Sequence, residues 1–465
     1  MDAEFNSVAQ SFNLYPETLG PCRMREEATI RRGRYRVTRF DQIEHGCLSD
    51  VGVRRSHNQD NYAVQLAVDD EGWKTRGHLF LVADGMGAHA VGEKASEQAA
   101  HIIPHIYQKH ATQGPVPGLR KAFVEANASI HSCGQLNREF EGMGTTGTAL
   151  LLRPDGAWVG HVGDSRCYRI RNGIIEQLSY DHSLVWEYAR LQHIDPDEVE
   201  DVPSNVIHRC LGPEPLVQVD VEGPHDIQPG DVFLLCSDGL SGPVSDAEMG
   251  AVVSVLPPAE ACRFLVDLAN LRGGPDNITA IVVRVLRSAE ATPKPPSAKS
   301  ASIPLPWWSL ALLAGTLCAV VAAGFISQGW TAAATPTLGL AVLCVVGGLV
   351  GLGIHYRYEQ TRPEEETQRP PAVPHRKRGC KIERPLLDRL VKALKTLQQM
   401  ANDNGWKPDW SQYDESQQKA QELLTSGDVS GAFREYCRAM LPLTRALQES
   451  RNKEEVFRPV WDKTR

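Results

Sequence analysis

The sequence predicts an α+β sandwich domain, followed by a two-helix transmembrane hairpin and a small all-α C-terminal domain. Strand-like apolar runs alternate with amphipathic helices in the first part, an uncharged stretch follows, and helical periodicity returns at the end. The 465 residues therefore divide into an N-terminal extension 1–41, an α+β domain 42–288, a linker 289–303, two transmembrane helices within 304–355, a linker 356–380 and a helical C-terminal domain 381–465.

The composition is that of a folded protein without a nucleic-acid partner. Hydrophobic residues make up 42% of the chain and charged residues 23%, which suits two or three domains with at least one sizeable core. A formal net charge of -8 disfavours non-specific binding to nucleic acid. The 11 cysteines are scattered, and those of the first domain lack metal-ligand spacing, so we interpret them as reduced thiols of a cytosolic domain.

Helix pairs placed between strand pairs support the sandwich. Segments 158–161 and 166–170 have the pattern of strands, and the sequence Arg-Asn-Gly at 171–173 predicts the turn after the second. Apolar residues of two preceding segments each recur on one helical face. These faces are Ala95, Ala99, Ile102, Ile103 and Ile106 for the first helix, and Leu119, Phe123, Ala126 and Ile130 for the second.

The uncharged stretch predicts a lipid bilayer as a partner. It contains two apolar runs, about 305–326 and about 337–354, of which the first reaches the roughly 20 residues that a span needs. Lysines and arginines flank the pair on both sides and are absent between the two runs, so both ends are expected to face the cytoplasm. The alternative is a buried helical hairpin in a soluble core. Small residues at four-residue spacing favour close packing of the two helices: Gly315, Ala319 and Ala323, then Gly347 and Gly351.

The C-terminal domain is predicted to be helical, with more apolar surface than it can bury alone. One helix carries an apolar face, and a helix, a turn at 427–428 and a second helix follow. About 80 residues in two or three helices bury little surface, so we expect a protein partner or self-association through these helices. The apolar positions are Leu386, Leu387, Leu390, Val391, Leu394 and Leu397, then Ala420, Leu423, Leu424, Ala432, Phe433, Tyr436 and Ala439.

Four aspartates stand at the ends of apolar runs, where their side chains can converge. Asp60, Asp84 and Asp238 each end such a run, and Asp276 opens one. Clustered carboxylates repel one another and raise one another's pKa unless cations lie between them. Oxygen ligands without a nearby Cys/His pair favour Mg²⁺ or Mn²⁺ over zinc. An Asp before Gly is more often only a turn former, and for Asp84 and Asp238, each followed by glycine, that alternative stays open on these residues alone.

Two further features fit phosphate chemistry. Gly85 and Gly87 let the backbone turn sharply, so the Gly85 carbonyl could also bind an ion. Two ions bridged by a carboxylate can hold a water as hydroxide and neutralise a phosphate during in-line attack. Arg55, five residues before Asp60, could grip the phosphate oxygens with two hydrogen bonds.

An ordered series of short motifs over about residues 45–288 resembles the metal-dependent protein phosphatase family, type 2C, in its bacterial form. Each motif alone is a weak signal, and the whole series is specific. The motifs are Gly52 to Asp60 (GVRRSHNQD), Asp84 to Gly87 (DGMG), Gly144 to Thr146 (GTT), Gly163 to Arg166 (GDSR), Asp181 to Ser183 (DHS), Ser237 to Leu240 (SDGL) and Asp276 to Thr279 (DNIT).

The resemblance implies two metal ions, Mn²⁺ or Mg²⁺. Asp60 would bridge them, Asp84 and the Gly85 carbonyl would complete one site, and Asp238 and Asp276 would complete the other.

It also implies a third, more labile ion and a phosphate-binding residue. Asp164, together with Asp238, would hold that ion, and Arg55 would bind the phosphoryl group. The implied fold is two packed antiparallel sheets flanked by helix pairs. The implied reaction is attack of a metal-bridging hydroxide on phosphoserine or phosphothreonine, in proteins phosphorylated by Ser/Thr kinases.

The sequence departs from the family pattern at two places. Ala88 stands where bacterial members usually have a second glycine, and no histidine follows Gly85 to act as a general acid, so protonation of the leaving group is unassigned. Segment 184–205, rich in acidic residues, matches the family's variable flap, which we expect to affect substrate choice.

Two functions from different classes remain open. The first is a serine/threonine protein phosphatase tethered to the cytoplasmic face of the membrane, with both the catalytic domain and the C-terminal region in the cytoplasm; a narrower form acts on an anti-sigma-antagonist type protein. The alternative is a catalytically silent, phosphoprotein-binding membrane scaffold. Since every expected metal ligand is present, the sequence favours the enzyme.

Overall fold

The computed structural model describes residues 43–87, 91–136, 138–199, 201–203, 206–286, 307–361 and 373–456. The predicted N-terminal extension and the linker 289–303 lie outside these ranges.

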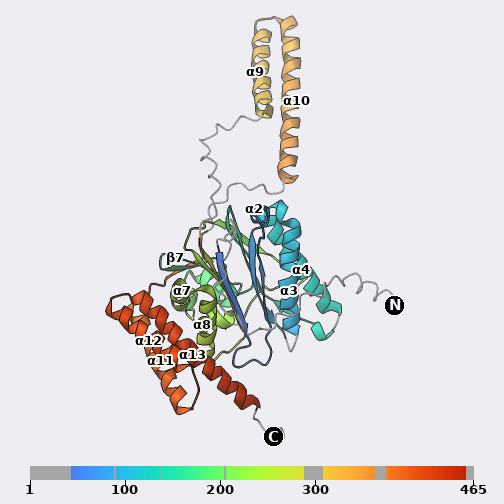
Figure 1. Ribbon diagram of the computed structural model, residues 1–465. Helices are drawn as coiled ribbons and strands as arrows, with labels where there is room; N and C mark the ends of the chain where they lie inside the picture. The colour runs from blue at the N-terminus through green and yellow to red at the C-terminus, as the bar shows by residue number, and fades with distance from the viewer. Residues whose placement is uncertain are drawn as a thin grey trace. The chain divides into compact units, whose positions relative to one another are not determined.

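Two antiparallel sheets pack face to face, as predicted (Figure 1). The first sheet has the strand order β1-β11-β10-β7-β8-β12. Its strands are β1 (Ile43–Asp50), β7 (Arg166–Arg171), β8 (Ile174–Gln177), β10 (Val232–Cys236), β11 (Ile278–Val285) and β12 (Arg376–Gly379).

The second sheet has the order β2-β3-β5-β6-β9, and the short β4 pairs with the end of β3. The predicted Arg-Asn-Gly turn lies in the first sheet, between β7 and β8, where Asn172 and Gly173 both have positive φ. The strands of the second sheet are β2 (Asp60–Gln65), β3 (His78–Met86), β4 (Gly144–Thr145), β5 (Gly147–Arg153), β6 (Gly156–Val162) and β9 (Asp220–His225).

Alternation along the strands produces the layers. In β10, Phe233 and Leu235 face the core between the two sheets, whereas Leu234 faces the helices on the outer side. In β3, Phe80 lies between the sheets and Leu81 faces the other outer layer. Both faces of each sheet are therefore covered, which is why these strands are apolar throughout rather than alternating with polar residues.

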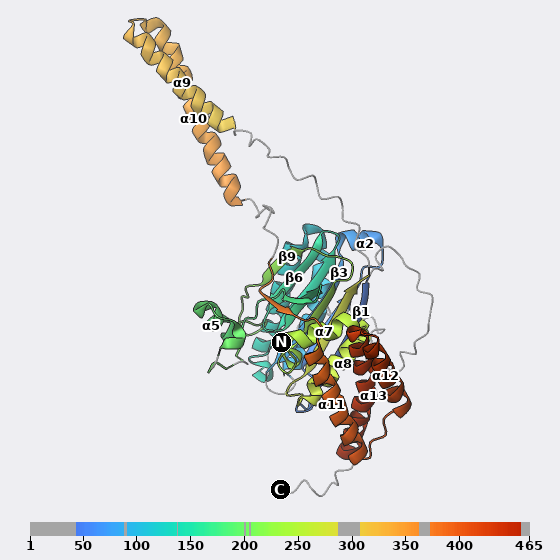
Figure 2. The same ribbon diagram turned by 90° about the vertical axis from the view of Figure 1, so that its left-hand side faces the viewer.

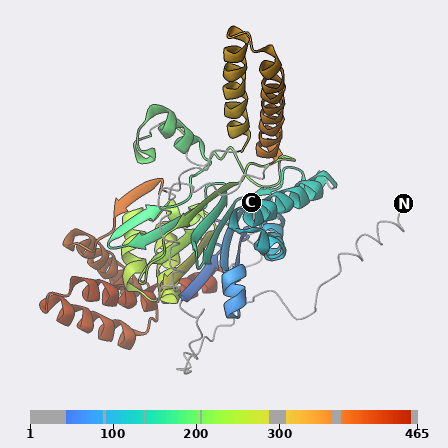
Figure 3. The ribbon, with the colours of Figure 1, turned by 90° about the horizontal axis from the view of Figure 1, so that it is seen from above.

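Helices cover both outer faces (Figure 3). The pair α3 and α4 covers the second sheet, with the predicted apolar faces of both helices buried against it. The pair α7 and α8 covers the first sheet. The bounds are α2 (Asp70–Thr75), α3 (Val91–His110), α4 (Pro115–Leu136), α5 (Leu184–Gln192), α6 (Asp238–Ser241), α7 (Asp246–Val255) and α8 (Pro258–Leu271), with short 3-10 turns η1 (Ala111–Gln113), η2 (Arg138–Phe140) and η3 (Pro196–Glu198).

The C-terminal region does not stand apart from the α+β domain. The predicted linker 356–380 is wrong at both ends, because α10 continues to Thr361 and Arg376–Gly379 forms β12, which pairs with β8. Helices α11, α12 and α13 follow, and their apolar faces join the core outside the first sheet. The bounds are α11 (Arg384–Asp403), α12 (Trp410–Thr425) and α13 (Val429–Val456).

Specific contacts fix this docking. A Cβ added to Gly250 of α7 would lie 2.6 Å from the Cβ of Cys380, so α7 closely approaches the end of β12. The hydroxyl of Thr444 in α13 donates to Asp267 of α8 at 2.6 Å, and Arg438 donates to Glu260 at 2.9 Å. The apolar surface that the sequence left unaccounted for in the C-terminal helices is thus largely buried on the α+β domain.

The uncharged stretch forms a hairpin of two helices, α9 (Trp307–Ser327) and α10 (Thr331–Thr361). The two pack closely at Gly315, where an added Cβ would lie 2.8 Å from Val345. Gly347, predicted to be in the contact, faces open space instead. Among the described helices, Ala334–Leu352 is long and apolar enough to cross a membrane, and Leu312–Ser327 is a shorter apolar helix.

Candidate active site

The first two predicted ligands are neighbours in the second sheet. Asp60 begins β2 and Asp84 lies near the end of β3, and the two residues are direct cross-strand partners. Side chains on paired positions of an antiparallel sheet point to the same face, so both carboxylates are directed to one place.

Asp238 and Asp276 reach the same place from the first sheet. Asp238 follows β10 as the first residue of α6, and Asp276 precedes β11, the antiparallel neighbour of β10. The hydroxyls of Ser237 and Thr279, each next to one of these strand ends, both donate to Oδ2 of Asp60 at 2.7 Å. The two sheets are therefore joined at the end where the aspartates gather.

The aspartates repel one another. Burial raises the pKa of Asp60 to about 7, and the charges of Asp238 and Asp276 contribute. Burial also raises the pKa of Asp84 well above its usual value. The charges of the other four carboxylates raise it further: Asp60, Asp238, Asp164 and Asp276. The pKa of Asp164 rises to about 7 through burial and the charge of Asp238. All five side chains thus lie within one electrostatic cluster.

This cluster fits hard divalent cations. Oδ1 of Asp60 and Oδ1 of Asp238 are buried and have no hydrogen-bond partner among the described residues, which is costly for a carboxylate unless a cation lies beside it. As the described side chains lie, no three His, Cys, Asp or Glu groups enclose a single point for an ion. Carboxylate oxygens are the ligands that Mg²⁺ and Mn²⁺ prefer.

Backbone contacts hold Asp84 and Gly85 in position. The N–H of Asp84 donates to Oγ1 of Thr146 at 2.9 Å, and its carbonyl accepts from Oγ1 of Thr145 at 2.9 Å. A Cβ on Gly85 would lie 2.2 Å from the carbonyl oxygen of Gly92, so only glycine fits there. Thr145, Thr146, Ser237 and Thr279 all stand in the quoted motifs, but the motifs alone did not predict their hydrogen bonds to Asp84 and Asp60.

Arg55 lies at the exposed side of the cluster. Its Nη2 is 2.7 Å from Oδ2 of Asp276, and the two side chains are 50% and 33% exposed. An ion pair this exposed contributes little to stability, so a phosphate can compete for the guanidinium at small cost.

Asp164 is held through its neighbour in the turn after β6. The N–H of Gly163 donates to Nδ1 of His182 at 2.9 Å, which leaves Nε2 of that ring to donate to Asp220 at 2.9 Å. His182 is thus a structural hydrogen-bonding residue, and it fixes the turn that carries Asp164.

Buried carboxylates at one end of two packed antiparallel sheets, with an arginine beside them, define a site suited to metal-assisted hydrolysis of phosphate esters. Residues 53–269 match the model of the protein phosphatase 2C family. The chain belongs to this family, and its enzyme class is serine/threonine protein phosphatase.

Its relatives include bacterial phosphatases. The serine/threonine phosphatase Stp of Listeria monocytogenes is 34% identical over 241 residues, which cover 50% of this chain and 93% of that protein. Protein phosphatase PhpP of Streptococcus pneumoniae is 36% identical over 248 residues, 52% of this chain and 97% of that protein. Among solved structures, the serine/threonine phosphatase PstP/Ppp of Mycobacterium tuberculosis is 32% identical with a TM-score of 0.47, covering 52% of this chain and 98% of that chain.

Proposed function

We propose that this chain dephosphorylates phosphoserine and phosphothreonine in cytoplasmic proteins with Mn²⁺ or Mg²⁺, while its hairpin tethers it to the membrane. The observation that carries the catalytic part is the gathering of Asp60, Asp84, Asp164, Asp238 and Asp276, with unpaired buried oxygens on two of them. A silent scaffold has no need for a cluster that is electrostatically unfavourable without cations.

The geometry supports exchanging two of the roles implied by the resemblance. Both lone pairs of Oδ2 of Asp60 already accept hydroxyl protons, from Ser237 and Thr279, so only Oδ1 is left for an ion. The pKa of Asp84 is raised by the charges of all the other four carboxylates, so we place Asp84 at the centre of the cluster. We infer that Asp84, rather than Asp60, bridges two ions. Asp60 would contribute Oδ1 alone, since its Oδ2 is bonded to the first sheet.

The remaining residues divide the work at the phosphate. Bound divalent cations would neutralise phosphate charge and lower the pKa of water near it. Asp238 and Asp276 would hold cations from the side of the first sheet, and Asp164 with Asp238 would hold a third. Gly85 lets the backbone approach closely, and Arg55 would orient the phosphoryl group by turning from Asp276 to the phosphate oxygens.

The first test concerns metal dependence. The full chain in detergent is expected to hydrolyse a phosphothreonine peptide only when Mn²⁺ or Mg²⁺ is present, and added chelator should abolish phosphate release. A colorimetric phosphate assay measures this. Undiminished turnover in excess chelator would contradict the proposal.

A second prediction separates two adjacent arginines. Arg55→Ala should raise KM for the phosphopeptide roughly ten- to hundredfold, because charge-assisted hydrogen bonds contribute about 1.5–3 kcal/mol. Arg54→Ala, the matched control, should change KM little. Steady-state kinetics on both variants decide the assignment, and equal effects would show that neither or both contact phosphate.

The surface of the hairpin supports membrane insertion over a soluble core. Small residues lie between the helices, with Ala322 fully buried and Ala341 4% exposed, whereas Leu317 and Leu343 are 66% and 71% exposed. Only 17% of the span Ala334–Leu352 is buried inside the protein. Large apolar side chains pointing outward need lipid or a partner, because water disfavours an exposed patch of this size.

Accessibility to a membrane-impermeant thiol reagent tests the topology. Gln328→Cys, between the two helices, should be labelled from outside the cytoplasm, and Val373→Cys, which follows α10 and is 71% exposed as Val, should not. The unsubstituted chain gives the background from its own cysteines. Labelling of Val373→Cys alone would invert the topology, and labelling of both from the same side would exclude two spans.

A partner or self-association through the C-terminal helices stays a prediction. Since Leu387, Leu394 and Phe433 are buried in the core shared with the phosphatase domain, such contacts would have to use other residues than those the sequence suggested.

A further inference from the structure

The segment 184–205, which we call the flap, is bonded at its base to the candidate active site. Its helix α5 begins after Ser183, whose hydroxyl accepts from the N–H of Trp186. The preceding residue, His182, donates its backbone N–H to the carbonyl of Gly163 at 2.7 Å, next to Asp164. Figure 2 shows α5 standing away from the sheets.

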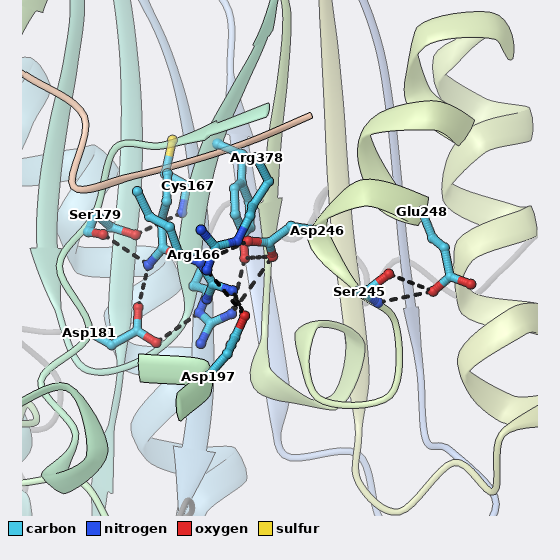
Figure 4. A network of polar contacts seen from close by, with 12 residues as sticks. Arg166, Cys167, Ser179, Asp181, Asp197, Ser245, Asp246, Glu248 and Arg378 are labelled. Carbon is cyan, nitrogen blue, oxygen red and sulfur yellow. Dashed lines mark hydrogen bonds and ion pairs between the residues drawn. The ribbon is translucent and has the colours of Figure 1, made fainter. Parts of the chain in front are cut away.

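The far part of the flap is held by β12. Arg376 donates to Oδ2 of Asp197, and Arg378 donates to Oδ2 of Asp195 and, at 3.4 Å, to Asp197. Figure 4 shows Arg378 and Asp197 within this network of polar contacts. Asp195 also accepts from the N–H of Asp197, so one carboxylate both closes the η3 turn and binds the strand.

Arg376 also connects to α7 and, through Asp246, to β7. Nε of Arg376 lies 3.5 Å from Oδ2 of Asp246, and Nη1 of Arg166 lies 4.0 Å from Oδ1 of the same carboxylate. Arg166 in turn donates to Asp181 at 2.7 Å, just before the base of the flap. The side chains of Arg376 and Asp246 are 9% and 8% exposed, so this contact is poorly screened by solvent.

We propose that Arg376 and Arg378 are positioning residues that hold the flap over the side of the site where Asp164 lies, and so favour binding of phosphoprotein substrates. The inference rests on the phosphatase reaction proposed above. Protein substrates extend beyond the carboxylates and can meet α5, whereas a small aryl phosphate fills only the phosphate position. Because β12 comes after the hairpin in the chain, residues beyond the hairpin would contribute to substrate affinity through the flap.

The test compares two substrates on the full chain. In the double variant Arg376→Ala/Arg378→Ala, KM for a phosphothreonine protein should rise roughly fivefold, because the flap loses its partly exposed ion pairs with β12. Turnover of an aryl phosphate should change by less than about twofold. Lys377→Ala is the matched control, because Lys377 lies on the same strand but pairs with Glu176 at 2.9 Å and not with the flap.

A charge exchange separates positioning from general damage to the fold. Arg378→Asp and Asp195→Arg should each raise KM for the protein substrate, and the two together should restore it at least in part. Trypsin should cut after Arg190 in α5 faster in the single variants than in the pair. The proposal is overturned by an unchanged KM in the double alanine variant, by equal loss on both substrates, or by no recovery in the exchanged pair. Absence of aryl phosphate turnover in the unaltered chain would instead refute the phosphatase function itself.

Discussion

Replacing Asp84 with asparagine is expected to reduce kcat on a phosphothreonine peptide roughly a thousandfold at saturating Mn²⁺. The change removes the carboxylate at the centre of the cluster, and metal ions supply several kcal/mol of charge stabilisation, at 1.36 kcal/mol for each tenfold in rate. In the presence of chelator, the same variant should melt at an unchanged or higher temperature, because one buried charge no longer repels its neighbours.

Asp155→Asn provides the control for this variant, because Asp155 is 45% exposed and, within the described part of the chain, forms its ion pair with Arg153 at a surface turn. It should leave both kcat and the melting temperature unchanged. A large loss of stability in Asp84→Asn would mean that the carboxylate serves the fold, and near-normal kcat would mean that another residue bridges the ions.

A chain ending at Leu286 is expected to lose most of its stability. It lacks β12 and α11–α13, which share a core with α7 and α8, and it leaves the buried Asp267 without its partners Thr444 and Gln448. Each large apolar side chain lost from a core costs about 2–5 kcal/mol, and a whole domain has only about 5–15 kcal/mol. The shortened chain should therefore aggregate or melt far below the full chain in a thermal scan.

The matched control removes only the hairpin. Replacing 307–361 by a flexible Gly/Ser linker that spans the same gap keeps every contact between the phosphatase domain and the C-terminal helices. This variant should be soluble and melt close to the full chain in detergent. Equal stability of the chain that ends at Leu286 would show that the docked helices add nothing to the phosphatase domain.

The layers and the carboxylate cluster were predictable because their signals are local. Apolar runs give strands such as β3 and β10, and each ligand candidate stands beside such a run in a short motif. The roles within the cluster were not predictable from the sequence. It does not show that two hydroxyls donate hydrogen bonds to one oxygen of Asp60.

The docking of the C-terminal region was missed for a different reason. β12 is four residues, Arg-Lys-Arg-Gly, and a basic segment without alternation has the composition of a linker. It is a strand because its backbone pairs with β8. The paired residues Gln177 and Arg376 are 199 positions apart in the sequence. No local pattern in the sequence encodes such a distant pairing, and the C-terminal apolar faces therefore seemed to need a separate partner.

The return of the chain to the first sheet also bears on how the protein is made. During synthesis from the N-terminus, β8 is an open edge strand until the hairpin has been produced and β12 follows it. An unpaired edge strand can pair with other chains, so the nascent phosphatase domain is exposed to aggregation until β12 has been made. In the completed fold, a protease that cuts between β11 and α9 would produce two fragments that stay associated. The pairing of β12 with β8 and the core shared with α11–α13 would still hold them together.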